Sequence, residues 1–132
     1  MSGRTAYPEP FFAEIHGERL FCVLHQGQGS PRCATLIVPP FAEEANKTRH
    51  LAARQARCLA ANGVTALLVD PYGTGDSAGE FADATWARWA SDIAGAVAWL
   101  EANGYATVVP VCIRLGAALA VSAGLFARDD PM

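Results

Sequence analysis

One pattern, a helical stretch that ends at Asn-Gly and passes at once into a short apolar run, occurs twice in this sequence. The first copy ends at Asn62-Gly63 and leads into residues 64–69, and the second ends at Asn103-Gly104 and leads into residues 105–109. Glycine after the last helical turn supplies a left-handed cap, and short apolar runs are typical of strands buried on both faces. Two copies are too few for a solenoid, so the pattern predicts successive helix–strand units of a parallel sheet.

The other segments complete the element order. Residues 11–15 and 20–24 flank His16-Gly17-Glu18-Arg19, which has the composition of a hairpin turn. The expected order is β-β-β-α-β-α-β-α, with a third strand at 34–38, helices at 48–62, 85–103 and 115–127, and a last strand at 108–111. We therefore expect a single α/β domain over residues 1–132, in which a leading antiparallel hairpin precedes parallel strands with flanking helices.

The spacing of side chains predicts which helix faces are buried. In the first helix, one side carries Leu51, Gln55, Cys58 and Leu59. In the second, apolar residues recur at helical spacing and are expected to pack in the core rather than to bind a ligand: Trp86, Trp89, Ile93, Val97 and Leu100. Asp83 or Thr85 is expected to cap the start of this second helix.

Composition excludes several classes of protein. The sequence is 52% hydrophobic and 17% charged, which excludes a disordered chain, and a net charge of −3 without a basic stripe argues against nucleic-acid binding. The four cysteines include no CxxC pair, so no metal site is expected. The longest apolar run, 115–127, is too short to span a membrane. With no signal sequence at the N-terminus, we expect a cytoplasmic protein with reduced thiols.

In an open parallel sheet, ligands bind beyond the carboxyl ends of the strands, and the first loop there is Pro39-Pro40-Phe41. The backbone N–H of Phe41 is best placed to point into such a site. Glu43 and Glu44 bring charge close to the strand end, although a solvated helix start, where acidic residues favour the helix dipole, explains them equally well.

The second loop, Asp70-Pro71-Tyr72-Gly73-Thr74-Gly75-Asp76-Ser77, is rich in glycine, which allows close turns of the backbone. It resembles a dinucleotide-binding fingerprint only loosely, because the third glycine, Gly79, is one place late and the next helix begins several residues on. We therefore expect no cofactor.

The third loop lies between the last strand and the last helix and has the spacing of a nucleophile elbow. Gly116 and Ala117 supply the small residues that this tight turn needs on the helix side. Cys112 holds the place usually given to glycine, and Arg114 holds the place of the nucleophile.

These residues resemble the α/β-hydrolase superfamily. The segment 70–77 looks like its D-x-x-G-x-G-x-S loop, and the segment 39–43 aligns with its oxyanion loop, with Pro39 and Pro40 in place of His-Gly. A narrower resemblance is to the second α/β hydrolase encoded with exosortase A systems, in bacteria that make exopolysaccharide and sort PEP-CTERM proteins. It is carried by three stretches: Pro-Pro-Phe-Ala-Glu-Glu-x-Asn-Lys, Ala84-Thr85-Trp86 and Arg114-Leu115-Gly116-Ala117.

The resemblance implies a hydrolase of ester, thioester or related acyl bonds that acts on a small-molecule ligand. The N–H groups of Phe41 and Leu115 would stabilise the oxyanion. The match covers the N-terminal half of the fold, so we expect a chain truncated after the elbow helix, whose missing strands belong to the same protein or to a sheet-completing partner. All three histidines lie upstream of the elbow, whereas the family's acid and histidine follow it. The chain alone is therefore expected to be inactive.

Arginine stays protonated and offers only hydrogen-bond donors, so Arg114 cannot attack a carbonyl. Cys112 and Ser77 are the other candidate nucleophiles, although a buried thiol and a local hydrogen bond explain them more simply. In the alternative function, a non-catalytic protein on a hydrolase scaffold uses Arg114 to bind a carboxylate or phosphate at a helix N-terminus. Arg114 can equally form an internal ion pair, for which the candidate partners are Glu43, Glu44 and Asp76.

Overall fold

The computed structural model describes residues 8–27, 32–38, 42–112 and 116–124, with the backbone alone described over 42–48. The elements are β1 (Pro8–Ile15), β2 (Glu18–His25), β3 (Cys33–Val38), α1 (Ala42–Ala61), β4 (Thr65–Val69), the 3-10 turn η1 (Phe81–Asp83), α2 (Trp86–Ala102), β5 (Thr107–Cys112) and α3 (Gly116–Ser122). The expected order is confirmed, and η1 is the one element in the described part that the sequence analysis did not predict.

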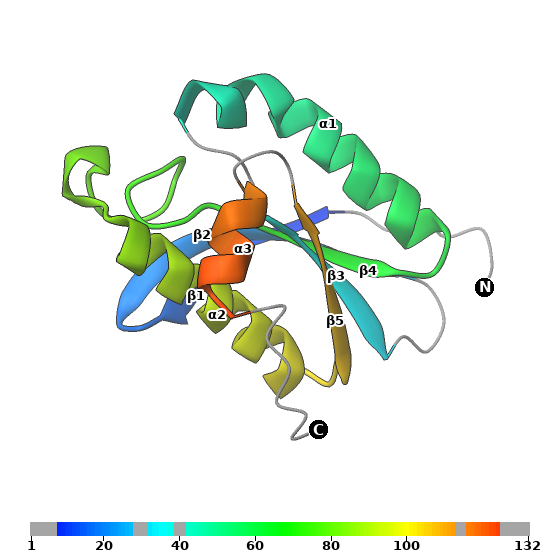
Figure 1. Ribbon diagram of the computed structural model, residues 1–132. Coiled ribbons are helices and arrows are strands. Elements are labelled where there is room, and N and C mark those ends of the chain that lie inside the picture. The colour runs from blue at the N-terminus through cyan, green and yellow to red at the C-terminus, as the bar shows by residue number, and fades with distance from the viewer. Residues whose placement is uncertain (1–7, 28–31, 39–41, 113–115, 125–132) are drawn as a thin grey trace.

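The five strands form one sheet in the order β1-β2-β4-β3-β5. β1 and β2 form an antiparallel hairpin around a two-residue turn, His16-Gly17, in which both residues have positive φ, as tight hairpin turns require. β2 pairs antiparallel with β4, whereas β3 pairs in parallel with β4 on one side and with β5 on the other. The expected hairpin followed by parallel strands is therefore confirmed, and the carboxyl ends of β3, β4 and β5 meet at one edge (Figure 1).

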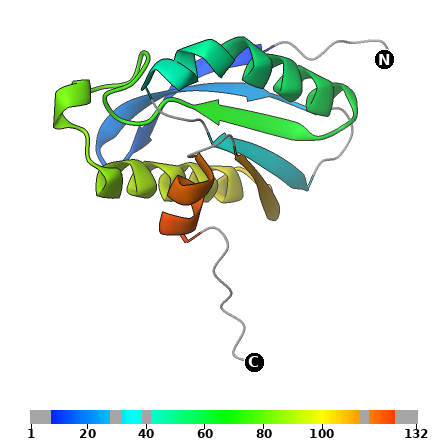
Figure 2. The same cartoon turned by 45° about the horizontal axis from the view of Figure 1, so that its top comes forward.

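The helices cover both faces of the sheet. Figure 2 shows α1 on one face, and α2 with α3 on the other. β3 lies between these layers: Leu36 belongs to the main core with residues of α2 and α3, while its neighbour Ile37 packs with Ala52 and Ala56 of α1. A strand buried on both faces explains why its sequence is an apolar run in which Thr35 is the one polar residue.

The prediction for α1 was wrong in two respects. The helix begins at Ala42, six residues before the expected start, and Leu51 is 51% exposed instead of buried. Gln55 and Cys58 are exposed as well, and Leu59 is only half-buried. The buried face consists of alanines, Ala52, Ala56 and Ala60, because small side chains let the helix backbone lie close to the sheet.

The prediction for α2 was nearly complete. Thr85 caps the helix, since its side chain accepts a hydrogen bond from the N–H of Arg88, as predicted. Trp89, Ile93 and Leu100 are buried as expected, and Val97 is half-buried. Trp86 is instead exposed, and its Nε1 donates a 2.8 Å hydrogen bond to Ser122 Oγ of α3.

Candidate functional site

The candidate site lies at the sheet edge where β3, β4 and β5 end. Phe41, Arg114 and Leu115 fall outside the described residues, and so does the expected contact of Arg114 with Asp76. Glu43 and Glu44 lie in the first turn of α1, with side chains that are likewise outside the description. What the structure does place at this edge is the glycine-rich loop after β4, residues 70–79, together with Arg49 of α1.

This glycine loop closes on itself and on β2. The N–H of Gly73 donates to Ala78 O at 2.8 Å, and the N–H of Ala78 donates to Arg19 O at 2.8 Å. Gly73, Gly75 and Gly79 all have positive φ, the conformation that glycine adopts without strain. The loop is therefore a folded, hydrogen-bonded unit attached to the hairpin.

Asp70, the first residue of the loop, has its carboxylate at the centre of this unit. Its Oδ2 lies 3.7 Å from Arg49 Nη1 and accepts a long hydrogen bond, 3.4 Å, from the N–H of Asp76. Burial raises the pKa of Asp70 from its ordinary value, and the Arg49 guanidinium and the Asp76 amide offset only part of this effect. The sequence analysis did not single out Asp70 as a site residue, although its position at the end of a buried strand was the available signal.

Asp76, an expected partner of Arg114, lies exposed in the glycine loop, and its backbone faces Asp70. The structure thus brings one of the predicted site residues together with a carboxylate that was not predicted.

The surroundings of the two alternative nucleophiles, Ser77 and Cys112, are those of residues with a structural role. Ser77 Oγ donates to the Asp70 carbonyl within the loop, as the simpler interpretation predicts. It also accepts a 2.7 Å hydrogen bond from the N–H of Phe21, which links the loop to β2 and was not predicted. Burial raises the pKa of the Cys112 thiol, so this thiol stays protonated near neutral pH and is a poor nucleophile. Among the residues that the structure describes, no group is placed to activate either side chain as a nucleophile.

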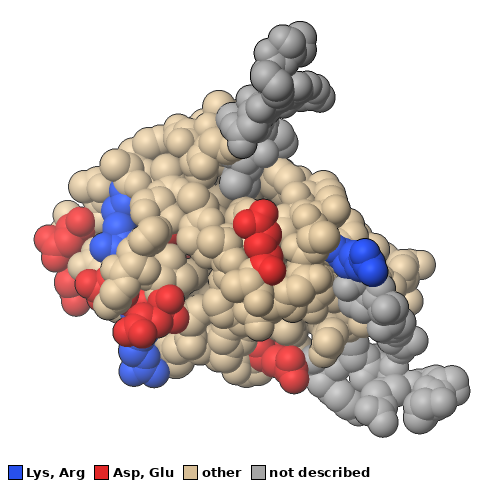
Figure 3. Space-filling view, turned by 90° about the horizontal axis from the view of Figure 1, so that it is seen from below, with Lys and Arg blue, Asp and Glu red and all other residues tan. Residues whose placement is uncertain are grey.

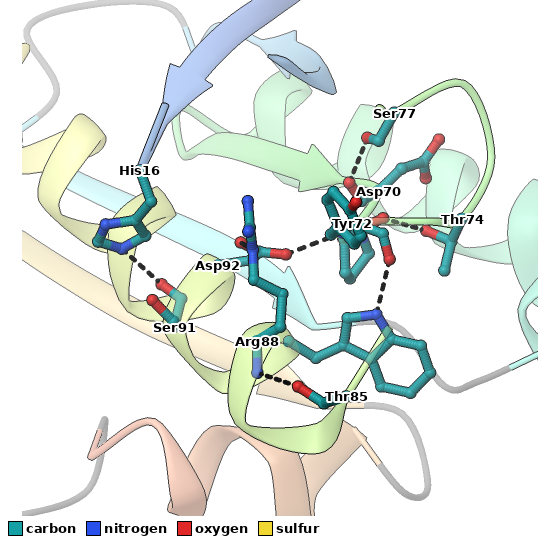
Figure 4. A network of polar contacts seen from close by, with 11 residues as sticks. His16, Asp70, Tyr72, Thr74, Ser77, Thr85, Arg88, Ser91 and Asp92 are labelled. Atoms are coloured by element: carbon teal, nitrogen blue, oxygen red, sulfur yellow. Dashed lines mark hydrogen bonds and ion pairs between the residues drawn. The ribbon is translucent and has the colours of Figure 1, made fainter. Parts of the chain in front are cut away.

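The three histidines are placed differently. His16 lies in the hairpin turn, where its Nε2 is 3.2 Å from Ser91 O (Figure 4). His25 pairs with Ala66 near the amino end of β4, away from the candidate site, and His50 is exposed on α1. Burial lowers the pKa of His25, and the nearby Arg57 lowers it further.

Within the described ranges, no group of three or more His, Cys, Asp or Glu side chains is arranged to hold a metal ion. The face seen from below in Figure 3 is largely uncharged: acidic side chains gather toward one end with others scattered across the face, and the basic side chains lie apart from one another. No helix in the described part of the chain is long and apolar enough to cross a membrane.

No protein-family model matches the sequence, and no curated protein matches it either. Solved structures do match. Est1E from Butyrivibrio proteoclasticus, with ferulic acid bound, is 25% identical with a TM-score of 0.69, over 90% of this chain and 48% of that one. XC6422 from Xanthomonas campestris, a serine hydrolase without a lid, is 16% identical with a TM-score of 0.75, over 89% of this chain and 56% of that one.

A third structure, an α/β serine hydrolase homologue from Coxiella burnetii, is 14% identical with a TM-score of 0.73, over 91% of this chain and 58% of that one. This chain thus spans about half the length of the structures that it matches. At these identities the likeness concerns the fold. The mixed sheet, its flanking helices and these likenesses show that the chain has the α/β-hydrolase fold.

Proposed function

We propose that the chain is the elbow-bearing half of a bacterial hydrolase of ester, thioester or related acyl bonds, of the kind associated with exosortase A and exopolysaccharide systems. One observation carries the hydrolase part: three parallel strands end at the same edge, and the loop after β4 is folded around a partly buried carboxylate there, that of Asp70. Ligands of open α/β sheets bind at such an edge. The link to exosortase systems rests on the resemblance of the three sequence stretches given above.

In this proposal Arg114 binds the substrate and does not attack it. Its guanidinium would donate hydrogen bonds to a carbonyl or carboxylate oxygen, while the N–H groups of Phe41 and Leu115 stabilise developing negative charge. Glu43, Glu44 and Asp76 are the proposed partners that orient Arg114. The 132-residue chain by itself is proposed to be inactive, because arginine is no nucleophile and neither Ser77 nor Cys112 is activated.

The same observation on Ser77 and Cys112 favours a second candidate function, a non-catalytic protein that binds small anions through Arg114. In this role the fold would serve as a scaffold, and the arginine would recognise a carboxylate or phosphate.

The test uses the native protein, purified at the length in which its source makes it, because the 132-residue chain alone is proposed to be inactive. The two measurements are hydrolysis of p-nitrophenyl butyrate and calorimetric binding of butyrate. Hydrolysis above the buffer rate that is lost in Arg114→Ala supports the hydrolase. Binding without hydrolysis, again lost in Arg114→Ala, supports the anion-binding protein. A matched control is Arg54→Ala, which removes an exposed arginine of α1 and should change neither measurement. A native protein that neither hydrolyses nor binds overturns both proposals.

A further inference from the structure

Three side chains of α2 hold one residue of the glycine loop, Tyr72 (Figure 4). Asp92 Oδ2 accepts a 2.8 Å hydrogen bond from the N–H of Tyr72, and Trp89 Nε1 donates a 2.8 Å hydrogen bond to Tyr72 O. The guanidinium of Arg88 lies 4.4 Å from the centre of the Tyr72 ring, within the range of a cation–π contact. Both backbone groups of Tyr72 and its ring are therefore held by one helix.

The burial of Asp92 indicates that it serves this contact. Its exposed fraction is 0%, and its second oxygen accepts a 3.1 Å hydrogen bond from Arg88 Nε. Burial of a carboxylate destabilises the folded state unless the group is paired and hydrogen-bonded. A well-packed apolar side chain at a buried position often gives equal or greater stability. Core packing alone therefore does not explain an aspartate at this position, whereas the hydrogen bond from the N–H of Tyr72 does explain it.

The contacts of Tyr72 continue into the rest of the loop. The Tyr72 ring occupies the space where a side chain on Gly79 would lie, so the start and the end of the loop pack against each other. Tyr72 is joined to Asp70 through Pro71, whose φ is fixed by its ring. Asp70 in turn fills the space beside Gly75 and reaches Arg49 of α1. The contacts thus run from α2 through the loop to the helix on the opposite face of the sheet.

We propose that Asp92, supported by Arg88 and Trp89, is a positioning residue of the candidate site: it holds the glycine loop in the shape that places Asp70 at the carboxyl edge of the sheet. The inference rests on the proposed function only in taking that edge as the place where a ligand binds. The position of the loop itself can be measured without any ligand.

Two variants test the inference: Asp92→Asn weakens the hydrogen bond from the N–H of Tyr72, and Trp89→Phe removes the hydrogen bond to its carbonyl. The control is Ile93→Val on the same helix, which trims a fully buried side chain that none of these bonds involves. Hydrogen exchange is followed at the amides of Gly73 and Ala78, whose bonds do not involve α2. Both anchor variants should speed this exchange by roughly tenfold or more, while the control leaves it at the wild-type rate.

A second readout is the titration of the Asp70 carboxyl by NMR. With the loop released and hydrated, its pKa should fall toward the ordinary aspartate value in both anchor variants but not in the control. The inference is overturned if the loop amides and Asp70 behave as in the wild type in both variants, or if the control changes them equally.

The two proposals can fail separately. In the native protein, Asp92→Asn should reduce kcat/KM for p-nitrophenyl butyrate, or the affinity for butyrate, by roughly tenfold. If the native protein neither hydrolyses nor binds these compounds, the proposed function fails, while the exchange and titration results still decide whether Asp92 positions the loop.

Discussion

At the scale of single residues, the position of the Asp70 carboxylate requires a glycine at position 75. Gly75 has a φ of +50°, and a Cβ there would collide with Asp70 Oδ2. Relief of that collision would move a carboxylate away from Arg49 and from the amide of Asp76. In the motif Asp-x-x-Gly-x-Gly, the absence of a side chain on the last glycine therefore leaves room for the carboxylate of the aspartate.

The prediction is that Gly75→Ala destabilises the protein more than an alanine at another glycine with positive φ. The matched control is Gly17→Ala, since Gly17 has a φ of +82° and nothing within 4 Å of the added Cβ. Both variants carry backbone strain, and Gly75→Ala should lose about 1–3 kcal/mol beyond the control because of the collision. Urea denaturation measures both. Equal losses would show that Asp70 moves aside at no cost.

His25 leads to a prediction about pH. The side chain is 2% exposed, its Nδ1 has no hydrogen-bond partner among the residues that the structure describes, and burial lowers its pKa from 6.5. Below pH 6.5 His25 binds a proton in the unfolded chain but stays neutral in the folded chain, which favours unfolding. The full contribution of the neutral histidine to the free energy of unfolding is therefore present above pH 6.5. That contribution is lost as the pH falls from 6.5 toward the lowered pKa, by at most about 1.4 kcal/mol per pH unit.

The measurement is the free energy of unfolding between pH 7.5 and pH 5 for the wild type and two variants. His25→Phe, which cannot be protonated, should show a weaker decline on acidification. His50→Gln removes an exposed histidine and should keep the wild-type decline. If His25→Phe declines as steeply as the wild type, other groups cause the acid sensitivity.

Residue-scale predictions from sequence succeeded where the partner is local in the chain. Asp83 or Thr85 was predicted as a cap because both precede a helical stripe, and Thr85 is the cap. Ser77 was predicted to bond nearby backbone, and its bond to the Asp70 carbonyl confirms this, whereas its bond to Phe21, 56 residues away, was not predicted. The roles of Asp70 and Asp92 could not be predicted in the same way. Asp92 meets Tyr72 across 20 residues of chain, and no periodic pattern reports such a contact.

At the scale of elements, α1 and α2 differ in how far they could be predicted. The large side chains of α2 recur at helical spacing and are mostly buried, so hydrophobic periodicity identifies its inner face. α1 buries alanines and exposes Leu51, so the positions of its large apolar side chains do not identify its inner face.

The close approach of α2 to β1 gives a prediction for a glycine within a helix. A Cβ on Gly95 would collide with Cγ2 of Ile15, a core residue. Alanine ordinarily stabilises a helix by about 1 kcal/mol relative to glycine, but at this position overpacking should outweigh that gain by about 1–2 kcal/mol. We expect Gly95→Ala to lower the melting temperature.

The control for this prediction is the reverse change on the exposed side of the same helix. Ala98 is exposed and does not belong to the main core, so Ala98→Gly should cost about 1 kcal/mol through helix propensity. Alanine is thus expected to be favourable at position 98 and unfavourable at position 95. A Gly95→Ala variant that is more stable than the wild type would show that Ile15 can move without cost.

At the scale of the whole molecule, the order of elements was predictable and the order of strands was not. The Asn-Gly repeats and the hairpin composition are local signals, and they gave β-β-β-α-β-α-β-α correctly. The placement of β3 between β4 and β5 depends on pairings between segments far apart in the chain, such as Leu36 with Leu67 and with Pro110. A resemblance to a known fold can supply that arrangement, but a single sequence's periodicity cannot.

The outer side of β5 leads to the last prediction. Within the described residues β5 pairs only with β3, and Val109 on this edge strand is 46% exposed. A strand edge with apolar side chains is a template for pairing with another chain. We therefore expect the purified 132-residue chain to self-associate as its concentration rises, through β5. Val109→Lys should shift sedimentation velocity profiles toward the monomer, because a charge on an edge strand opposes pairing.

Val121→Lys is the control, since Val121 is 63% exposed but lies on α3. If both lysines act equally, association depends on apolar surface in general; if neither acts, β5 is not the surface that associates.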